Sequence, residues 1–155
     1  MKHDPRLHDQ ATDRSRIELL LAEMSEAHDA LAAALAAHEQ LTREATSDQN
    51  RYTESRWRLS KASLLRRALL NRIHEQLMPL LDLADAAQLD GLLAADRQIV
   101  QVSSAHIQRW CSAAIDRDWN GYRAAAADIC RRMRAEVETE KRRLYPLLIR
   151  AAVAA

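Results

Sequence analysis

The sequence predicts an all-α protein, specifically an antiparallel four-helix bundle with up-down-up-down topology. The chain has 155 residues with only two glycines and three prolines, and this scarcity of helix breakers favours long helices. Residues typical of strands are scarce, because phenylalanine is absent and the valines and isoleucines are scattered. Apolar residues also recur in steps of three and four along four segments, which is typical of the inward faces of bundle helices.

The first helix is predicted over about residues 13–46. Residues 1–11 are polar, contain Pro5 and show no periodicity, so we expect a disordered N-terminal arm followed by a bundle over residues 12–155. The polar run at residues 46–48 suits a turn or a helix cap. The inward stripe of this helix comprises Ile17, Leu21, Met24, His28, Leu31, Leu35 and His38.

The second and third helices are predicted over about residues 50–84 and 86–116. Pro79 lies near the end of the second helix, where a kink is expected if the helix continues. The stripe of the second helix comprises Leu59, Ala62, Arg66, Leu69, Ile73, Leu77, Leu80 and Ala84. The stripe of the third helix comprises Leu89, Leu92, Ile99, Ser103, His106, Trp110 and Ala113.

The fourth helix is predicted over about residues 119–152. Its stripe comprises Tyr122, Ala126, Ile129, Met133, Glu136, Glu140, Leu144 and Leu147. The pattern Leu-x-Pro-Leu-Leu occurs at residues 77–81 and again at residues 144–148, which suggests a duplicated helical hairpin or a coincidence in a leucine-rich chain. Connections of only a few residues place successive helices side by side and antiparallel.

Charge and hydropathy exclude several classes of protein. The 23 basic and 22 acidic side chains give a net charge of +1, whereas a general nucleic-acid surface needs an excess of positive charge. The N-terminus lacks the apolar stretch of a secretory signal, and no apolar run approaches the ~20 residues of a membrane span. We therefore expect a cytoplasmic protein that binds neither nucleic acid nor membrane and is a monomer or a homodimer.

The sequence shows no catalytic constellation. Cys111 and Cys130 lie in helical patterns among apolar residues and are predicted to be buried free thiols. There is no Cys-x-x-Cys spacing, P-loop, Gly-rich motif or nucleophile with an evident base. We therefore do not expect an enzyme.

Chemistry is expected where the inward stripes become polar. Glu136 and Glu140 lie one turn apart on the same helix face, so their carboxylates can converge. Buried charges must be paired, hydrated or bound to a cation, because leaving one unpaired costs several kcal/mol. The stripes place six ionisable side chains inward: His28, His38, Arg66, His106, Glu136 and Glu140.

Two cations could balance these carboxylates. One is iron or another divalent metal, held by His28, His106, Glu136 and Glu140. The other is the guanidinium of Arg66, which can bridge both glutamates in a buried ionic network without any cofactor. Counting from the turns places His28, Arg66 and His106 at one depth, with both glutamates farther along, which favours the network. His38 is expected near a bundle end and partly solvated.

The chain resembles the hemerythrin-like (HHE cation-binding) bundles, in which helices two and four each carry His-x-x-x-Glu before a proline. That family binds a non-haem di-iron centre. On this resemblance, His28 and His106 match the ligands of helices one and three, and Glu140 matches the glutamate of helix four. Glu136 stands at the histidine position of helix four. Leu69 and Ile73 occupy the ligand positions of helix two. The resemblance therefore implies a degenerate metal site.

A weaker resemblance links the second half of the chain to the regulator of sigma D family, whose bundles bind a sigma factor. The matching stretches are residues 114–118, 128–129 and 135–148. Together these observations predict a non-catalytic regulatory or protein-interaction bundle with an unidentified protein partner. The alternative is a metal-binding sensor or storage bundle that uses the two histidines and two glutamates named above.

Overall fold

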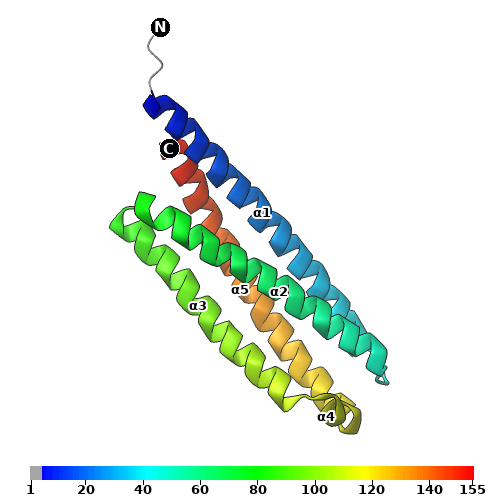
Figure 1. The fold of residues 1–155 in the computed structure, drawn as a ribbon. Helices are drawn as coiled ribbons and strands as arrows, with labels where there is room; N and C mark the ends of the chain where they lie inside the picture. Colours follow the sequence, from blue (N-terminus) through cyan, green and yellow to red (C-terminus); the bar gives the residue numbers. More distant parts are fainter. Residues whose placement is uncertain (1–4) are drawn as a thin grey trace.

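The structure is a computed structural model that describes the backbone of residues 5–155 and the side chains of residues 9–155. These residues form long helices and short connections, with no strand among them, so the all-α prediction is confirmed (Figure 1). The long helices are α1 (Pro5–Thr42), α2 (Gln49–Leu77), α3 (Leu83–Arg109) and α5 (Trp119–Ala154). The short elements are the 3₁₀ turn η1 (Met78–Leu80) and the helix α4 (Ser112–Arg117).

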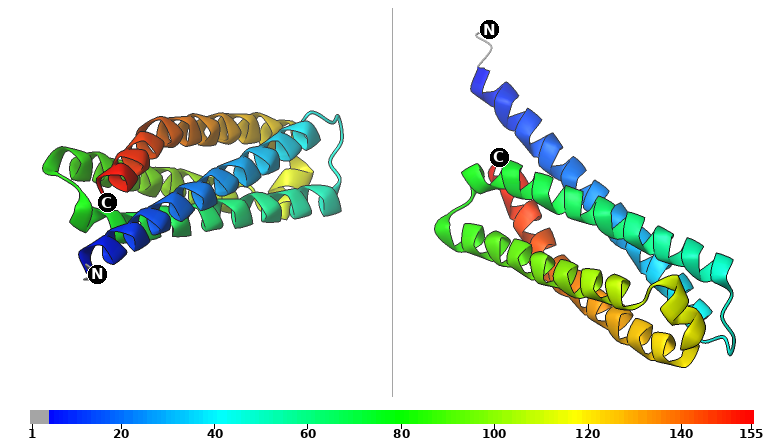
Figure 2. Two further views of the ribbon diagram at one scale, coloured as in Figure 1. Left: turned by 90° about the horizontal axis from the view of Figure 1, so that it is seen from above. Right: turned by 60° about the horizontal axis from the view of Figure 1, so that its bottom comes forward.

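The four long helices pack as an antiparallel bundle. Helix α1 packs against both α2 and α5, and α3 packs mainly against α5. The views in Figure 2 show α4 at the end of the bundle where α3 passes into α5. The C-terminal end of α5 lies near the N-terminal half of α1 (Figure 1).

Helix α1 begins earlier than the sequence predicts. Residues 5–11 were expected in a disordered arm, but they form its first turns, and residues 1–4 of that arm lie outside the described residues. Pro5 suits this position, because proline lacks a backbone N–H and the N–H groups of the first helical turn have no intrahelical acceptor. The capping site expected at residues 46–48 is present, since the Asp48 side chain accepts a hydrogen bond from the backbone N of Arg51 at 3.2 Å.

The two Leu-x-Pro-Leu-Leu motifs have different structures. Helix α2 ends at Leu77 and Pro79 lies in η1, so the predicted continuation to residue 84 is wrong. A proline removes an intrahelical donor and crowds the preceding turn, which favours a stop there. Pro146 instead lies inside α5, which continues to Ala154.

The connection between α3 and α5 also differs from the prediction. The third helix was expected over residues 86–116, but α3 starts at Leu83 behind the cap Asp82 and ends at Arg109. Cys111 is exposed rather than buried, because it lies in the turn before α4; Cys130 is buried in α5, as predicted.

Three apolar clusters fill the bundle interior in succession along its axis. The first contains Ile17, Leu20, Met24, Leu70, Ile73, Leu77, Leu89, Leu92, Leu144, Leu147, Leu148 and Ala152. The middle cluster contains Leu31, Leu35, Ala62, Ile129, Cys130 and Val137. The last contains Leu41, Tyr52, Trp110, Ala114, Ile115, Trp119, Tyr122 and Ala126. Within the described residues, no helix has an apolar stretch long enough to cross a membrane.

Candidate functional site: two buried polar clusters

A buried ionic cluster separates the first apolar cluster from the middle one. At its centre the guanidinium of Arg66 (α2) donates to Glu140 Oε2 (α5) at 2.6 Å and also to Asp96 Oδ1 (α3). All three side chains are at least nine-tenths buried. One cation thus bridges carboxylates from two helices, and the forked geometry of arginine suits this arrangement.

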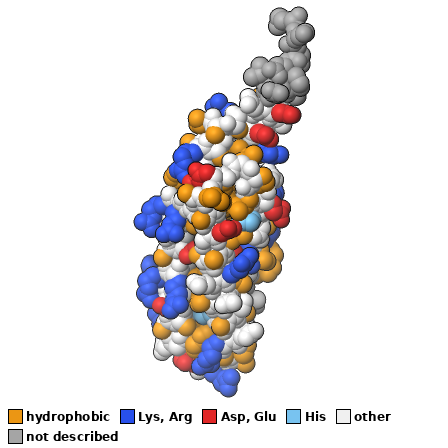
Figure 3. All heavy atoms as spheres, turned by 90° about the vertical axis from the view of Figure 1, so that its left-hand side faces the viewer, with side chains coloured by type: hydrophobic (Ala, Val, Ile, Leu, Met, Phe, Trp, Pro, Cys, Tyr) orange, Lys and Arg blue, Asp and Glu red, His pale blue; other side chains and the backbone are white. Residues whose placement is uncertain are grey.

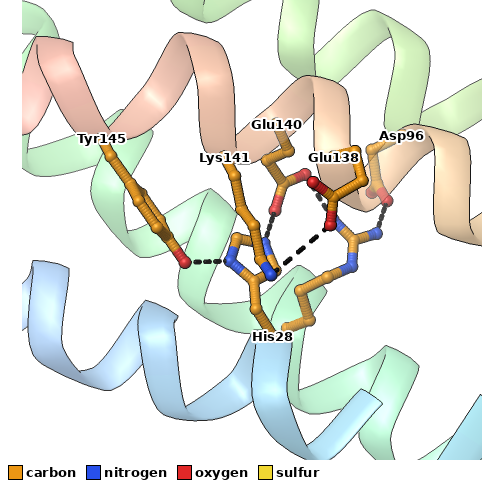
Figure 4. A network of polar contacts seen from close by, with 7 residues as sticks. His28, Asp96, Glu138, Glu140, Lys141 and Tyr145 are labelled. Atoms are coloured by element: carbon orange, nitrogen blue, oxygen red, sulfur yellow. Dashed lines mark hydrogen bonds and ion pairs between the residues drawn. The ribbon is translucent and has the colours of Figure 1, made fainter. Parts of the chain in front are cut away.

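His28 (α1) joins the same cluster from the opposite side. Its Nε2 lies 2.7 Å from Glu140 Oε1, and its Nδ1 lies 2.5 Å from the Tyr145 hydroxyl. Figure 4 shows His28 between Glu140 and Tyr145. A carboxylate oxygen can only accept, so Nε2 carries a proton, and in a neutral imidazole Nδ1 then accepts from the hydroxyl. Both oxygens of Glu140 are therefore occupied by protein donors.

The surroundings of Arg66 keep it charged. Burial by itself lowers the pKa of the guanidinium, but Glu140 and Asp96 outweigh that effect, so the pKa is raised. Arg67 adds a second positive charge at the edge of the cluster. Its Nε lies 3.3 Å from Asp96 Oδ2, close enough for an ion pair but without the alignment of a hydrogen bond. We call the following six residues the ionic cluster: His28, Arg66, Arg67, Asp96, Glu140 and Tyr145.

The ionic cluster differs from the predicted network in one member. Arg66 pairs with Glu140, as the network hypothesis required, but its second carboxylate is Asp96 and not Glu136. Glu136 Oε1 is buried without a hydrogen-bond partner, and the pKa of its carboxyl is raised by burial and then by Glu140. The sequence did hold a signal for Asp96, because it continues the stripe of Leu92 at a spacing of four.

A second polar cluster separates the middle apolar cluster from the last. His38 Nε2 lies 2.9 Å from the Tyr122 hydroxyl, and its Nδ1 lies 2.9 Å from Ser55 Oγ. His106 stacks on Tyr122, with ring centroids 5.8 Å apart. His38 lies four residues before the end of α1, as expected, but it is only 2 % exposed, so the expected partial solvation is wrong. Tyr122 lies on the predicted inward stripe of the fourth helix, whereas Ser55 lies on none of the predicted stripes.

Burial keeps these histidines neutral near pH 7. The pKa of His38 falls from 6.5 to about 4, first because burial disfavours the charged ring and then because Arg56 repels it. The pKa of His106 is lowered for the same two reasons. Burial raises the pKa of Tyr122 to about 12, so its hydroxyl stays protonated.

The predicted common depth of His28, Arg66 and His106 is only half right. His28 and Arg66 meet through Glu140, whereas His106 lies with His38 and Tyr122. The partner of Arg66 on α3 is Asp96, ten residues before His106 and therefore about 15 Å away along the helix. The error came from extending the third helix to residue 116, which moved its inward residues along the axis.

These positions do not fit a metal centre of the hemerythrin type. Neither Leu69 nor Ile73 offers a ligand atom, and Arg66 already neutralises Glu140. Among the described residues, no group of three or more His, Cys, Asp or Glu side chains could hold a metal ion. The predicted ligands are divided: His28 and Glu140 lie in the ionic cluster, His106 lies in the second cluster, and Glu136 is bonded to neither.

Comparison with known proteins adds no family to this description. The chain matches no family model, no curated protein and no solved structure.

Proposed function

We propose that this chain is a regulatory bundle that acts by binding a partner protein through the outer face of α2, and not by catalysis. The observation that carries this proposal is an exposed apolar stripe. Trp57, Leu64 and Leu65 are 62 %, 59 % and 57 % exposed, and with Lys61 they follow the spacing of one helix face. Large apolar residues gathered on one exposed face are typical of interaction sites.

The charge around this stripe indicates the chemistry of the partner. Helix α2 carries seven basic and two acidic side chains, although the chain as a whole is nearly neutral. Of the seven basic side chains, only Arg66 is buried, so six remain outside the buried core. On the face of the molecule drawn in Figure 3, basic side chains lie beside hydrophobic and acidic ones. We expect the partner to present an apolar patch with an acidic rim, such as an acidic amphipathic helix.

The buried clusters support binding rather than catalysis. In the ionic cluster, Arg66, Glu140 and Asp96 are already paired with one another, and His38 has a partner on each ring nitrogen. Such groups fix the packing of the helices, and their mutual hydrogen bonds already occupy the charged atoms of Arg66 and Glu140. This interior suits a rigid scaffold that presents α2.

The double variant Trp57→Glu/Leu65→Glu tests the proposal. We expect it to keep its thermal unfolding midpoint, because both side chains are exposed, and to bind the partner at least about tenfold more weakly. The partner is first recovered from source cells with the wild-type chain. It is then purified, and its affinity is measured by calorimetry against both chains. Leu83→Glu is the matched control, because Leu83 is exposed but lies outside α2.

Two results would contradict the proposed function. One is equal affinity of the purified partner for the double variant and the wild type. The other is a concentration-dependent dimer of the wild-type chain in sedimentation velocity that disappears in the double variant. That result would mean that a second copy of the chain covers the stripe.

A further inference from the structure

A cavity of about 250 Å³ lies between α2 and α3, with α1 and α5 beneath it. It exists because the C-terminal half of α3 does not pack tightly, since Asp96 is the last buried residue of that helix. Small serines face the cavity where large apolar side chains would fill it: Ser60 and Ser63 from α2, and Ser103 and Ser104 from α3.

Much of the cavity lining is apolar. It includes aliphatic side chains from all four long helices: Leu31, Leu59, Leu64, Ile99, Ile107, Ile129 and Met133. Leu64 and Ile107 are about half exposed, which places them where the cavity opens to solvent. A cavity of this size is smaller than the usual ~300–1,000 Å³ pocket for drug-sized ligands, so the occupant should be a small molecule with an apolar body.

One end of the cavity is positively charged. Arg56 lines it, with its guanidinium carbon 5.9 Å from the centre of the Tyr122 ring. Within the described residues, no carboxylate forms an ion pair with Arg56, although eleven other arginines have one. His38 and His106 share this end but stay neutral, because burial and Arg56 lower the pKa of each ring. A single unpaired cation favours a ligand with a single negative charge.

The opposite end of the cavity would not accept that charge. Glu136 lines this end with a buried, unpartnered oxygen, and Glu140 lies close enough to raise the pKa of its carboxyl. Arg66 is also there, but Glu140 and Asp96 already hold it. Arg56 and Arg66 are ten residues apart on α2, or about 15 Å along the helix axis. An anion is therefore directed to the Arg56 end.

We propose that this cavity binds a small amphipathic carboxylate, with its carboxylate paired to Arg56 and its unbranched apolar tail lying between α2 and α3. The tail would fill the space that large apolar side chains would occupy in place of Ser63 and Ser103. The carboxylate would give Arg56 the ion pair that no carboxylate among the described residues supplies.

Calorimetric titration of the full chain with octanoate tests this proposal, with octanol and octyltrimethylammonium as matched probes. We expect saturable one-to-one binding of octanoate, at least about tenfold tighter than that of octanol, and no binding of the cation. Arg56→Gln should weaken octanoate about tenfold and leave octanol unchanged. Arg58→Gln is the control, because Arg58 is an exposed neighbour on α2 paired with Glu54.

A second variant tests the location of the site. Ser103→Leu should fill the cavity, abolish the binding of octanoate and keep or raise the thermal unfolding midpoint; Ser63→Leu serves the same purpose if the first variant does not fold. In ¹⁵N-correlated NMR spectra, octanoate should shift backbone amides of residues 59–64 and 99–107. The proposal is overturned if octanoate does not saturate, if octanol binds equally well, or if both filled variants bind octanoate like the wild type.

This inference can be tested separately from the proposed function, although Leu64 belongs both to the exposed stripe and to the cavity lining. Trp57 and Leu65 do not line the cavity, so Trp57→Glu/Leu65→Glu should bind octanoate normally. If this double variant loses partner binding but still binds octanoate, the two surfaces are separate. The same conclusion follows if Ser103→Leu loses octanoate binding but still binds the partner.

Discussion

Replacing Arg66 with alanine is expected to lower the free energy of unfolding by about 3 to 5 kcal/mol, a large share of the ~5 to 15 kcal/mol that stabilises a typical domain. The substitution leaves Glu140 and Asp96 buried without the cation that bridges them. Urea denaturation followed by circular dichroism measures the loss. Arg58→Ala is the control; it removes only an exposed ion pair with Glu54 and should cost no more than about 0.5 kcal/mol.

A variant in which all three charges are neutralised distinguishes two causes of the lost stability: the unpaired buried carboxylates and the lost packing of the Arg66 side chain. In Arg66→Met/Asp96→Asn/Glu140→Gln no charge of the central triad remains buried, and an uncharged acceptor still faces His28. We expect this variant to regain most of the stability that Arg66→Ala loses. A loss below about 1 kcal/mol in Arg66→Ala would mean that the two carboxylates have another partner, and the ionic cluster would not be the central feature of the fold.

Acidification is expected to destabilise the protein through His38. Its pKa is about 4 in the folded chain and 6.5 when unperturbed, so between these pH values the unfolded state binds a proton that the folded state does not. The stability associated with neutral His38 is therefore complete above about pH 6.5 and is lost as the pH falls towards 4. The shift corresponds to about 3 kcal/mol.

The difference between wild type and His38→Gln isolates this contribution from the titration of carboxylates. Free energies of unfolding are measured from pH 7 to pH 4, and the wild-type curve should fall more steeply. The groups around the ring set the size of the effect: burial and Arg56 lower its pKa, His106 adds to this, and Glu39 opposes it. His106→Gln should remove a smaller part of the slope. Parallel curves for wild type and His38→Gln would show that His38 does not carry the acid sensitivity.

The fold could be predicted from the sequence because its determinants are local. The spacing of apolar residues places the long helices, and the capping aspartate at residue 48 was visible as a polar interruption. The ends of the second and third helices could not be predicted equally well. Pro79 ends a helix while Pro146 does not, and this difference depends on tertiary packing around each proline.

The candidate site was predictable in its residue types but not in its pairings. His28, Arg66 and Glu140 lie on inward stripes and meet in the ionic cluster. Whether Arg66 takes Glu136 or Asp96 depends on the axial register between α2 and α3, which no local pattern encodes. The cavity was not predictable, because it reflects how far the C-terminal half of α3 stands from α2.

Metal analysis is the most direct test of the claim that Arg66, rather than a metal ion, balances the buried carboxylates. The chain is expressed in medium supplemented with iron, manganese and zinc, purified without chelator and measured by inductively coupled plasma mass spectrometry. We expect less than about one metal per ten chains. We also expect the same thermal unfolding midpoint with and without EDTA. One metal or more per chain, lost in His28→Ala or Glu140→Ala and accompanied by a lower midpoint in EDTA, would contradict this claim.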